Sequence, residues 1–308
     1  MSDISSTAIK EKDFKNYYLL DKIKNYISLL KPRVMSLSIF TSLVGLYIAP
    51  NSISIQSSLL VLLSISIGSG ASGALNMWYE RDIDKLMERT KDRVLPLGKV
   101  KPLFALLYGL CLAVISVGLL YYVSNFLAAS LLALTIFFYI FIYTIWLKKR
   151  TPQNIVIGGA AGAFPPMIGW VSVTGSISLE ILLIFMIIFI WTPPHFWALA
   201  LYKSDDYKRA GIPMMPLVVG NKRTINMIIF YSILLLPIAL LLGMYYSLFY
   251  FVSALILNSI FIYLSLSLKK NSDDLGALEK KAQTLFFFSI LYLFNIFSII
   301  LIDNLIWQ

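Results

Sequence analysis

The chain has 308 residues, of which 58% are hydrophobic and only 14% are charged. Soluble domains carry about 25% charged residues, so this composition excludes an ordinary water-soluble protein and predicts one that lies in lipid. The single cysteine, Cys111, excludes an intramolecular disulfide framework, and the net charge of +10 is spread over short segments, which disfavours nucleic-acid binding.

Apolar segments long enough to cross a bilayer follow one another along the chain. A helix needs ~20 residues for the crossing, and no segment shows the alternation typical of a lipid-facing strand. We therefore predict an all-α fold, a polytopic membrane bundle of about nine transmembrane helices. In chain order the predicted spans are Val34–Ala49, Ser58–Trp78, Leu103–Val123, Phe126–Leu147, Ile155–Val173, Leu179–Tyr202, Ile225–Tyr246, Leu248–Leu268 and Thr284–Ile302. The first span is short, and a start nearer Leu29 is an open alternative.

The basic residues support this division independently. All 26 Lys and Arg fall in the N-terminal stretch or in the loops after the second, fourth, sixth and eighth spans. Because basic loops stay in the cytoplasm, the N-terminus is predicted to be cytoplasmic and the C-terminus periplasmic. The first 30 residues contain several acids and no apolar core, unlike a signal peptide or a mitochondrial presequence. We expect a bacterial inner-membrane protein, with a cytoplasmic segment over residues 1–30 and one intramembrane domain over residues 31–308.

Acidic residues gather at the cytoplasmic end of the second span. Asn76, Glu80 and Asp84 recur every four residues, so they share one helix face. Asp82 lies about 200° around the helix from Glu80 and is expected to pair with a basic neighbour. Amide and carboxylate oxygens suit Mg²⁺, which usually takes one or two carboxylates together with water and phosphate. The spacing therefore indicates a metal and phosphate site, with a solvated helix end as the alternative.

The segments on either side of this cluster fit the same interpretation. Arg89 and Arg93 follow the acids and are placed to hold phosphate oxygens that a metal does not reach. The small residues over 68–74 precede Asn76. They either permit close helix packing or leave room beside Asn76 for a flat or elongated substrate.

The end of the sixth span carries a second group of charges, on the same side of the membrane. It contains Asp205 and Asp206 together with Lys203, Lys208 and Arg209. Proline pairs at 165–166 and 193–194 are expected to break the fifth and sixth spans, either as packing kinks or beside a cavity. His195, the only histidine, follows the second pair. It is either a hydrogen-bonded core residue or a contact to substrate or iron.

These residues carry a family resemblance. Asn76-x3-Glu80-x3-Asp84 resembles the first acidic motif of the UbiA-type intramembrane prenyltransferases, helical bundles that move a prenyl group from its diphosphate to an aromatic or similar acceptor. Other segments resemble the branch of that superfamily that farnesylates heme: Glu80-Arg-Asp82-Ile-Asp84-x2-Met87-x-Arg89-Thr90, Lys31-Pro-Arg33-Val34, Arg150-Thr-Pro-Gln-Asn154, Ala163-x-Pro165-Pro166-x-x-Gly169-Trp170, His195 and Asp206-Tyr-x-x-Ala210-Gly-Ile-Pro213. The matches extend from Lys31 to about Gly220.

The resemblance implies a reaction as well as a fold. It implies transfer of a farnesyl group from farnesyl diphosphate to a vinyl group of heme b, giving heme o, with Mg²⁺ as cofactor. The metal-diphosphate would be held by Asn76, Glu80, Asp84 and Asp206. The basic residues expected to grip phosphate are Arg33, Arg89, Arg93, Lys203 and Arg209. His195 would ligate the iron or orient the heme, and Lys148 would meet the propionates or only set the topology. A downstream heme A synthase or terminal oxidase assembly is the implied recipient of the product.

Two departures and two alternatives accompany this interpretation. The wider superfamily often has a second Asp where this chain has Ala210, and many relatives have Asp where it has Glu80. A symmetric pair of metal sites is therefore in question. One alternative is a prenyltransferase that acts on a quinone-precursor ring and needs no histidine. The other is a secondary transporter, although transporter sites lie near the bilayer midplane whereas these acids lie at one edge.

Overall fold

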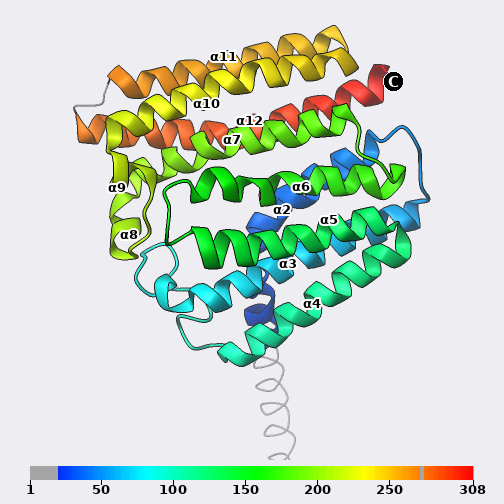
Figure 1. Cartoon of the computed structure of the whole chain (residues 1–308), viewed down its shortest axis with the longest axis horizontal. Helices are drawn as coiled ribbons and strands as arrows, with labels where there is room; N and C mark the ends of the chain where they lie inside the picture. Colours follow the sequence, from blue (N-terminus) through cyan, green and yellow to red (C-terminus); the bar gives the residue numbers. More distant parts are fainter. Residues whose placement is uncertain (1–19, 271–273, 308) are drawn as a thin grey trace, which may run out of the picture.

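The computed structural model describes residues 20–270 and 274–307, and within them every regular element is a helix. In this part of the chain, eight helices are long and apolar enough to span a membrane, accompanied by the shorter α2 (Pro32–Tyr47) (Figure 1). The eight are α3 (Ile55–Asp84), α4 (Pro102–Val123), α5 (Phe126–Phe137) continued by η1 (Phe138–Leu147), α6 (Asn154–Thr174), α7 (Leu179–Tyr202), α10 (Asn221–Leu242) continued by η2 (Gly243–Tyr245), α11 (Leu248–Lys270) and α12 (Leu275–Trp307). The chain is a multi-pass membrane protein, as predicted.

Each predicted span corresponds to a helix, and the differences lie at the ends. α3 continues beyond Trp78 to Asp84, and α12 begins at Leu275 rather than Thr284. Hydropathy detects only the part of a helix that lies in hydrocarbon, whereas helices can continue with charged residues outside it. A first span starting near Leu29 is wrong. Residues 20–29 are helical, but this helix ends before Leu30, and α2 begins separately at Pro32. Most of the predicted N-terminal segment 1–30 lies outside the described residues.

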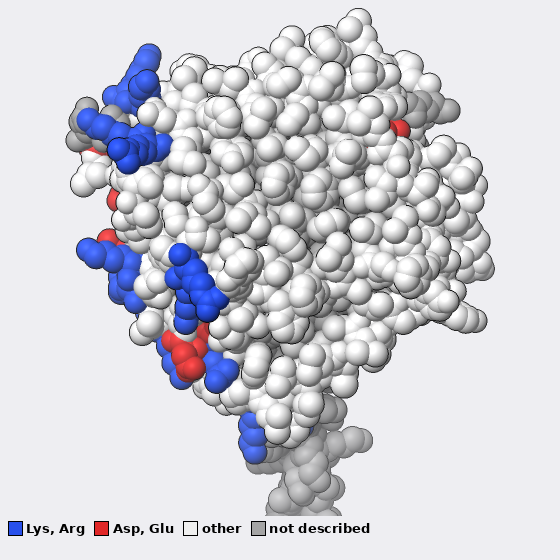
Figure 2. All heavy atoms as spheres, viewed as in Figure 1, with Lys and Arg blue, Asp and Glu red and all other residues white. Residues whose placement is uncertain are grey.

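The charged loops gather at one side of the bundle. Figure 2 shows Lys and Arg side chains along one edge of the molecule, with the opposite side almost free of them in this view. The ends of α3, η1 and α7 reach this side, and so do the short helices α8 (Ser204–Arg209) and α9 (Met215–Val219) (Figure 1). The candidate site lies at this charged side.

The helices α2 and α6 pack with their backbones in contact. A Cβ atom on Gly45 would lie 2.0 Å from the carbonyl oxygen of Pro166, and one on Gly169 would lie 2.3 Å from that of Ser42. Only glycine permits this approach.

Both α6 and α7 run through their proline pairs without ending, so the expectation that these pairs break the spans is wrong. Residues of α2, α3, α5 and α6 line one cavity.

Candidate active site

One face of the end of α3 buries its polar side chains. Asn76, Glu80 and Asp84 are all buried, as the spacing of four residues predicts. Asp82 is exposed and pairs with Lys85 at 3.2 Å, also as predicted. Since buried carboxylates need charged or hydrogen-bonding partners, the residues that face this side of α3 define the site.

Cations from two other segments neutralise the two buried carboxylates. Lys148, directly after η1, forms an ion pair with Glu80. Arg93, in the loop after α3, donates from Nη1 to Asp84 Oδ2 at 2.8 Å. The hydroxyl of Thr90 donates to the backbone carbonyl of Asp84 at 2.9 Å, which holds this loop against the helix end. The loop after α3 therefore supplies its own cation to the acid that precedes it.

The amide of Asn76 connects two further segments. Lys31 Nζ donates to its Oδ1 at 2.6 Å, and its Nδ2 donates to Thr144 Oγ1 at 3.0 Å. Thr144 lies in the π-helix η1 and donates in turn to the Tyr139 carbonyl at 2.8 Å. π-Helical turns are rare and are frequent at functional sites. This one places Thr144 and Lys148 against the same face of α3.

Lys31 has an unusual backbone. Its φ of 54° and ψ of 61° make it the one non-glycine residue with positive φ in the described part of the chain. This left-handed conformation costs about 1–3 kcal/mol and persists only where the surroundings impose it. Here Pro32 begins α2 immediately afterwards, and the side chain extends into the bundle. Burial lowers the pKa of Lys31 to about 7, and the positive charge of Arg93 is the second cause of the lowering. An anion bound beside it would favour the charged form again.

The second acidic stretch reaches the first. Asp206, in α8, is buried and pairs with Arg209 of the same helix. Its Oδ1 also accepts a hydrogen bond from the backbone N–H of Glu88 at 3.3 Å. Since Glu88 lies four residues after Asp84, the two stretches are brought to one region as the sequence predicted. Within the described ranges, however, no three Asp, Glu, His or Cys side chains gather closely enough to hold a metal by themselves.

The other basic residues predicted to contact phosphate lie around this cluster rather than in it. Arg33, Arg89 and Lys203 have exposed side chains. The Lys203 ammonium lies 5.6 Å from the centre of the Tyr202 ring. In the structure, Lys31, Arg93, Lys148 and Arg209 are therefore the cations in direct contact with the four predicted ligands.

His195 is packed inside the contact between α7 and α12. Its ring stacks on Trp191, with the ring centres 4.3 Å apart, and on Phe286 at 4.7 Å. The distance between its Nδ1 and Ser289 Oγ is 2.6 Å. The hydrogen-bonded core role is therefore present. Because Nδ1 is engaged, Nε2 is the nitrogen that remains for contact with a substrate.

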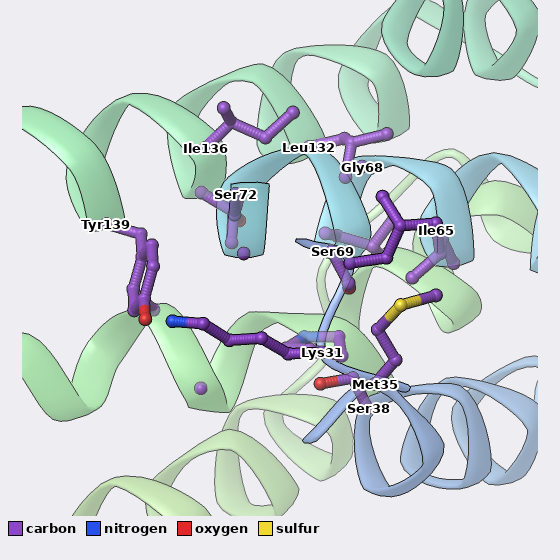
Figure 3. Close-up of a pocket in the computed structure, with 17 residues that line it drawn as sticks. Lys31, Met35, Ser38, Ile65, Gly68, Ser69, Ser72, Leu132, Ile136 and Tyr139 are labelled. Carbon is purple, nitrogen blue, oxygen red and sulfur yellow. The ribbon is translucent and has the colours of Figure 1, made fainter. Parts of the chain in front are cut away.

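An elongated cavity leads from Lys31 into the bundle. It has a volume of about 140 Å³ and is enclosed by α2, α3, α5 with η1, and α6 (Figure 3). Figure 3 shows Lys31 extending toward Tyr139 at one end. Gly68, Ser72 and Gly73 line its wall, so the small residues before Asn76 do leave open space beside α3. Gly68 and Gly73 also permit close packing, since added Cβ atoms would lie 2.9 Å from Leu132 and 3.0 Å from the Leu30 carbonyl oxygen.

Sequence reasoning missed three residues of this site. Lys31 precedes the first span in a Lys-Pro-Arg segment, which was the available signal for its role. Tyr139 and Thr144 lie in a long apolar segment, where nothing distinguishes them from lipid-facing or packing residues. Their roles depend on the π-helical register of η1, which no local pattern predicts.

A helical membrane bundle with paired acids and bases beside a mainly apolar cavity suits a molecule with a charged head and an apolar tail. The model of the UbiA prenyltransferase family matches residues 38–291. The chain belongs to this family, which confirms the resemblance seen in its motifs.

Relatives that are about half identical to this chain match it over almost its whole length. A protoheme IX farnesyltransferase 2 from Mesorhizobium japonicum is 51% identical over 99% of this chain and 97% of its own length. A protoheme IX farnesyltransferase from Bartonella quintana is 50% identical over 100% and 96%. Both alignments extend over almost the whole of each chain.

Solved structures share the fold at much lower identity. A digeranylgeranylglyceryl phosphate synthase superimposes with a TM-score of 0.77 at 19% identity, covering 92% of this chain and 99% of that one. A UbiA homolog from Archaeoglobus fulgidus, bound to GPP and Mg²⁺, gives a TM-score of 0.62 at 18% identity, covering 90% and 99%. These likenesses confirm the all-helical intramembrane fold.

Proposed function

We propose that this protein transfers a farnesyl group from farnesyl diphosphate to a vinyl group of heme b and so forms heme o. The observation that carries the proposal is the identity of about half of all residues, over nearly the full length, with proteins named protoheme IX farnesyltransferase. The same relatives disfavour a quinone-precursor ring as acceptor and a transport function.

The donor set fits Mg²⁺ held jointly with the substrate. The oxygens at the end of α3 come from Glu80, Asp84 and Asn76, and Asp206 adds another from α8. Among the residues that the structure describes, no three acids form a complete protein cage. Mg²⁺ usually binds through one or two carboxylates with water and substrate phosphate. The Archaeoglobus fulgidus homolog binds GPP with Mg²⁺. Bound Mg²⁺ would neutralise charge on the departing diphosphate.

Each proposed ligand already carries a cation, which suggests how the head group enters. Lys31 donates a hydrogen bond to Asn76, and ion pairs join Lys148 to Glu80, Arg93 to Asp84 and Arg209 to Asp206. In our proposal these cations turn to the phosphate oxygens when the diphosphate binds, and the ligand oxygens are released toward the metal. Both sets of charges are thus in place before the reaction, which is how fixed electrostatics lower a barrier. The exposed Arg33, Arg89 and Lys203 would attract the anion from outside.

The farnesyl tail would lie in the apolar cavity below Lys31. When the allylic C–O bond breaks, its electron pair leaves with the diphosphate and a delocalised cation remains at the tail. The cavity walls, from α2, α3, α5 and α6, keep water from this cation. Tyr139 lines the same cavity and presents an aromatic ring near the charged end. The heme vinyl then forms the new carbon–carbon bond, and water adds to the resulting cation and loses a proton.

Heme would approach from outside this cavity, which is far too narrow for a porphyrin. His195 would contact the heme through Nε2, with Ser289 and the stacked rings fixing its orientation. Lys148 is committed to Glu80, which favours a role at the diphosphate over one at the propionates.

The remaining assignments follow from the charge distribution and the relatives. We place the protein in a bacterial inner membrane, with its charged side and N-terminus in the cytoplasm and its C-terminus in the periplasm. Residues 31–308 would form the catalytic domain. The product would pass to a heme A synthase or a terminal oxidase assembly.

The test is direct. Purified protein in lipid nanodiscs is incubated with heme b, farnesyl diphosphate and Mg²⁺, and the tetrapyrroles are analysed by mass spectrometry. The proposal predicts a product whose mass equals heme b plus a farnesyl group and one hydroxyl. Unchanged heme b, with folded protein and both substrates present, would contradict it.

A further inference from the structure

The cavity beside α3 has the charged Lys31 at one end and mainly apolar side chains at the other. Four residues line the end nearest the basic loops: Lys31 just before α2, Gly73 of α3, Tyr139 of η1 and Ala161 of α6. The helices α2, α3, α5 and α6 contribute one residue each to the far end: Ser38, Ile65, Leu132 and Ile168. The directions of α2, α3, α5 and α6 all agree with this order (Figure 1). The cavity is therefore a slot that runs parallel to the helices.

The far end is closed by tightly packed side chains. Ile65 and Ile168 are each 1% exposed and Leu132 is 2% exposed. A Cβ atom added at Gly68 would lie 2.9 Å from Leu132 Cδ1, so α3 and α5 have no spare space at this level. Three branched apolar residues from three helices thus form a floor, and the two isoleucines are stiff at χ1 because they are β-branched.

The depth of the slot can be estimated from helix geometry. Ile65 precedes Asn76 by eleven residues on α3, which places it about 16 Å deeper at ~1.5 Å per residue. The main chain of a farnesyl group has about twelve carbons and measures roughly 14 Å in an extended zigzag, from bonds of ~1.5 Å. One more isoprene unit adds about 5 Å on the same basis. The distance between the Asn76 level and the floor therefore fits three units and not four.

The slot is too small to hold a whole farnesyl chain unless a lining side chain moves. A cavity of about 140 Å³ resembles one that takes up a single benzene ring, so the space holds only part of the chain as it stands. Met35 lines the slot and is long, unbranched and adaptable, so it can move aside for the tail (Figure 3). The floor residues cannot move aside in this way. The slot therefore limits the length of the prenyl chain that it accepts.

We propose that Ile65, supported by Leu132 and Ile168, sets the chain length of the prenyl donor at three isoprene units. This inference rests on the proposed function and adds to it the donor that the site selects. Ile65 lies about one helical turn below Gly68 and Ser69 on α3. Its role is that of a specificity-determining residue.

The test compares three donors in the same nanodisc assay. Wild type, I65A and S69L receive heme b with geranyl, farnesyl or geranylgeranyl diphosphate, and kcat/KM is measured for each donor from the product masses. Wild type is expected to prefer the farnesyl donor over the geranylgeranyl donor. I65A should raise the geranylgeranyl-to-farnesyl ratio at least about tenfold, the scale of hydrophobic-pocket discrimination. S69L, which fills the slot midway, should instead raise the geranyl-to-farnesyl ratio.

A matched control distinguishes the effect of shortening a floor residue from the general effect of removing buried atoms. Ile184 of α7 is fully buried and does not line the slot, so I184A removes the same atoms elsewhere and should leave the donor ratios at wild-type values. If I65A does not fold, the S69L result decides alone. A wild type that farnesylates heme, with folded I65A or S69L showing unchanged ratios, would overturn the chain-length inference only. A wild type that transfers no prenyl group to heme would contradict the proposed function itself.

Discussion

Lys148 at the end of η1 forms an ion pair with Glu80 of α3, and both side chains are largely buried. The pair joins segments separated by 68 positions in the chain. It thus ties the fourth span to the acidic end of the second and connects stability to the proposed chemistry.

Removing one partner of this pair should cost stability. In K148M the Glu80 carboxylate stays buried without its cation, a loss of the order of 3 kcal/mol for buried pairs. We expect a lower thermal unfolding midpoint in detergent for K148M. The double variant K148M/E80Q, which removes both charges, should recover most of it. Equal midpoints for K148M and wild type would show that the pair contributes nothing to the fold.

Two aspartates at the same helix end should behave oppositely. Asp84 is buried and bound to Arg93, whereas Asp82 is exposed and paired with Lys85. D84N should lower kcat/KM for farnesyl transfer by at least about 100-fold, the usual scale for losing one fixed electrostatic contact. D82N makes the same chemical change two residues away and should stay within about threefold of wild type. Similar losses in both variants would argue for a general effect of charge.

This contrast also shows how much of the site could be predicted. The spacing of Asn76, Glu80 and Asp84 specifies a shared face, since helix period alone decides it. The partners of these residues could not be predicted. Lys31 and Lys148 meet α3 only through the packing of α2 and η1, which no local pattern encodes. The spans were predictable because lipid imposes a strong composition on them, but their charged ends were not, as α12 shows by starting at Leu275.

Lys31 should act on the diphosphate rather than on the fold alone. Its ammonium contacts Asn76 Oδ1 at the mouth of the cavity. K31M should weaken binding of a non-reactive farnesyl diphosphate analogue about tenfold, the lower range for a charged hydrogen bond. Isothermal titration calorimetry measures this loss, and K24M, a change at an exposed lysine, is the control. Identical affinities for K31M and K24M would remove Lys31 from the phosphate site.

His195 should affect the acceptor and not the donor. H195A removes the ring that stacks on Trp191 and bonds to Ser289. We expect weaker heme binding and a changed Soret band in an absorbance titration, with the affinity for the diphosphate analogue unchanged. S289A keeps the ring but loses its orienting hydrogen bond and should give a smaller loss. An unaltered heme titration for H195A would restrict His195 to packing.

The central claim is that acids from two separated stretches serve one metal-diphosphate group. Electron paramagnetic resonance of Mn²⁺, added in place of Mg²⁺ with the diphosphate analogue, tests it most directly. D84N and D206N should each lose bound Mn²⁺, while D82N and D205N, which alter exposed neighbours, should bind it as wild type does. Full Mn²⁺ binding by folded D206N would contradict the claim.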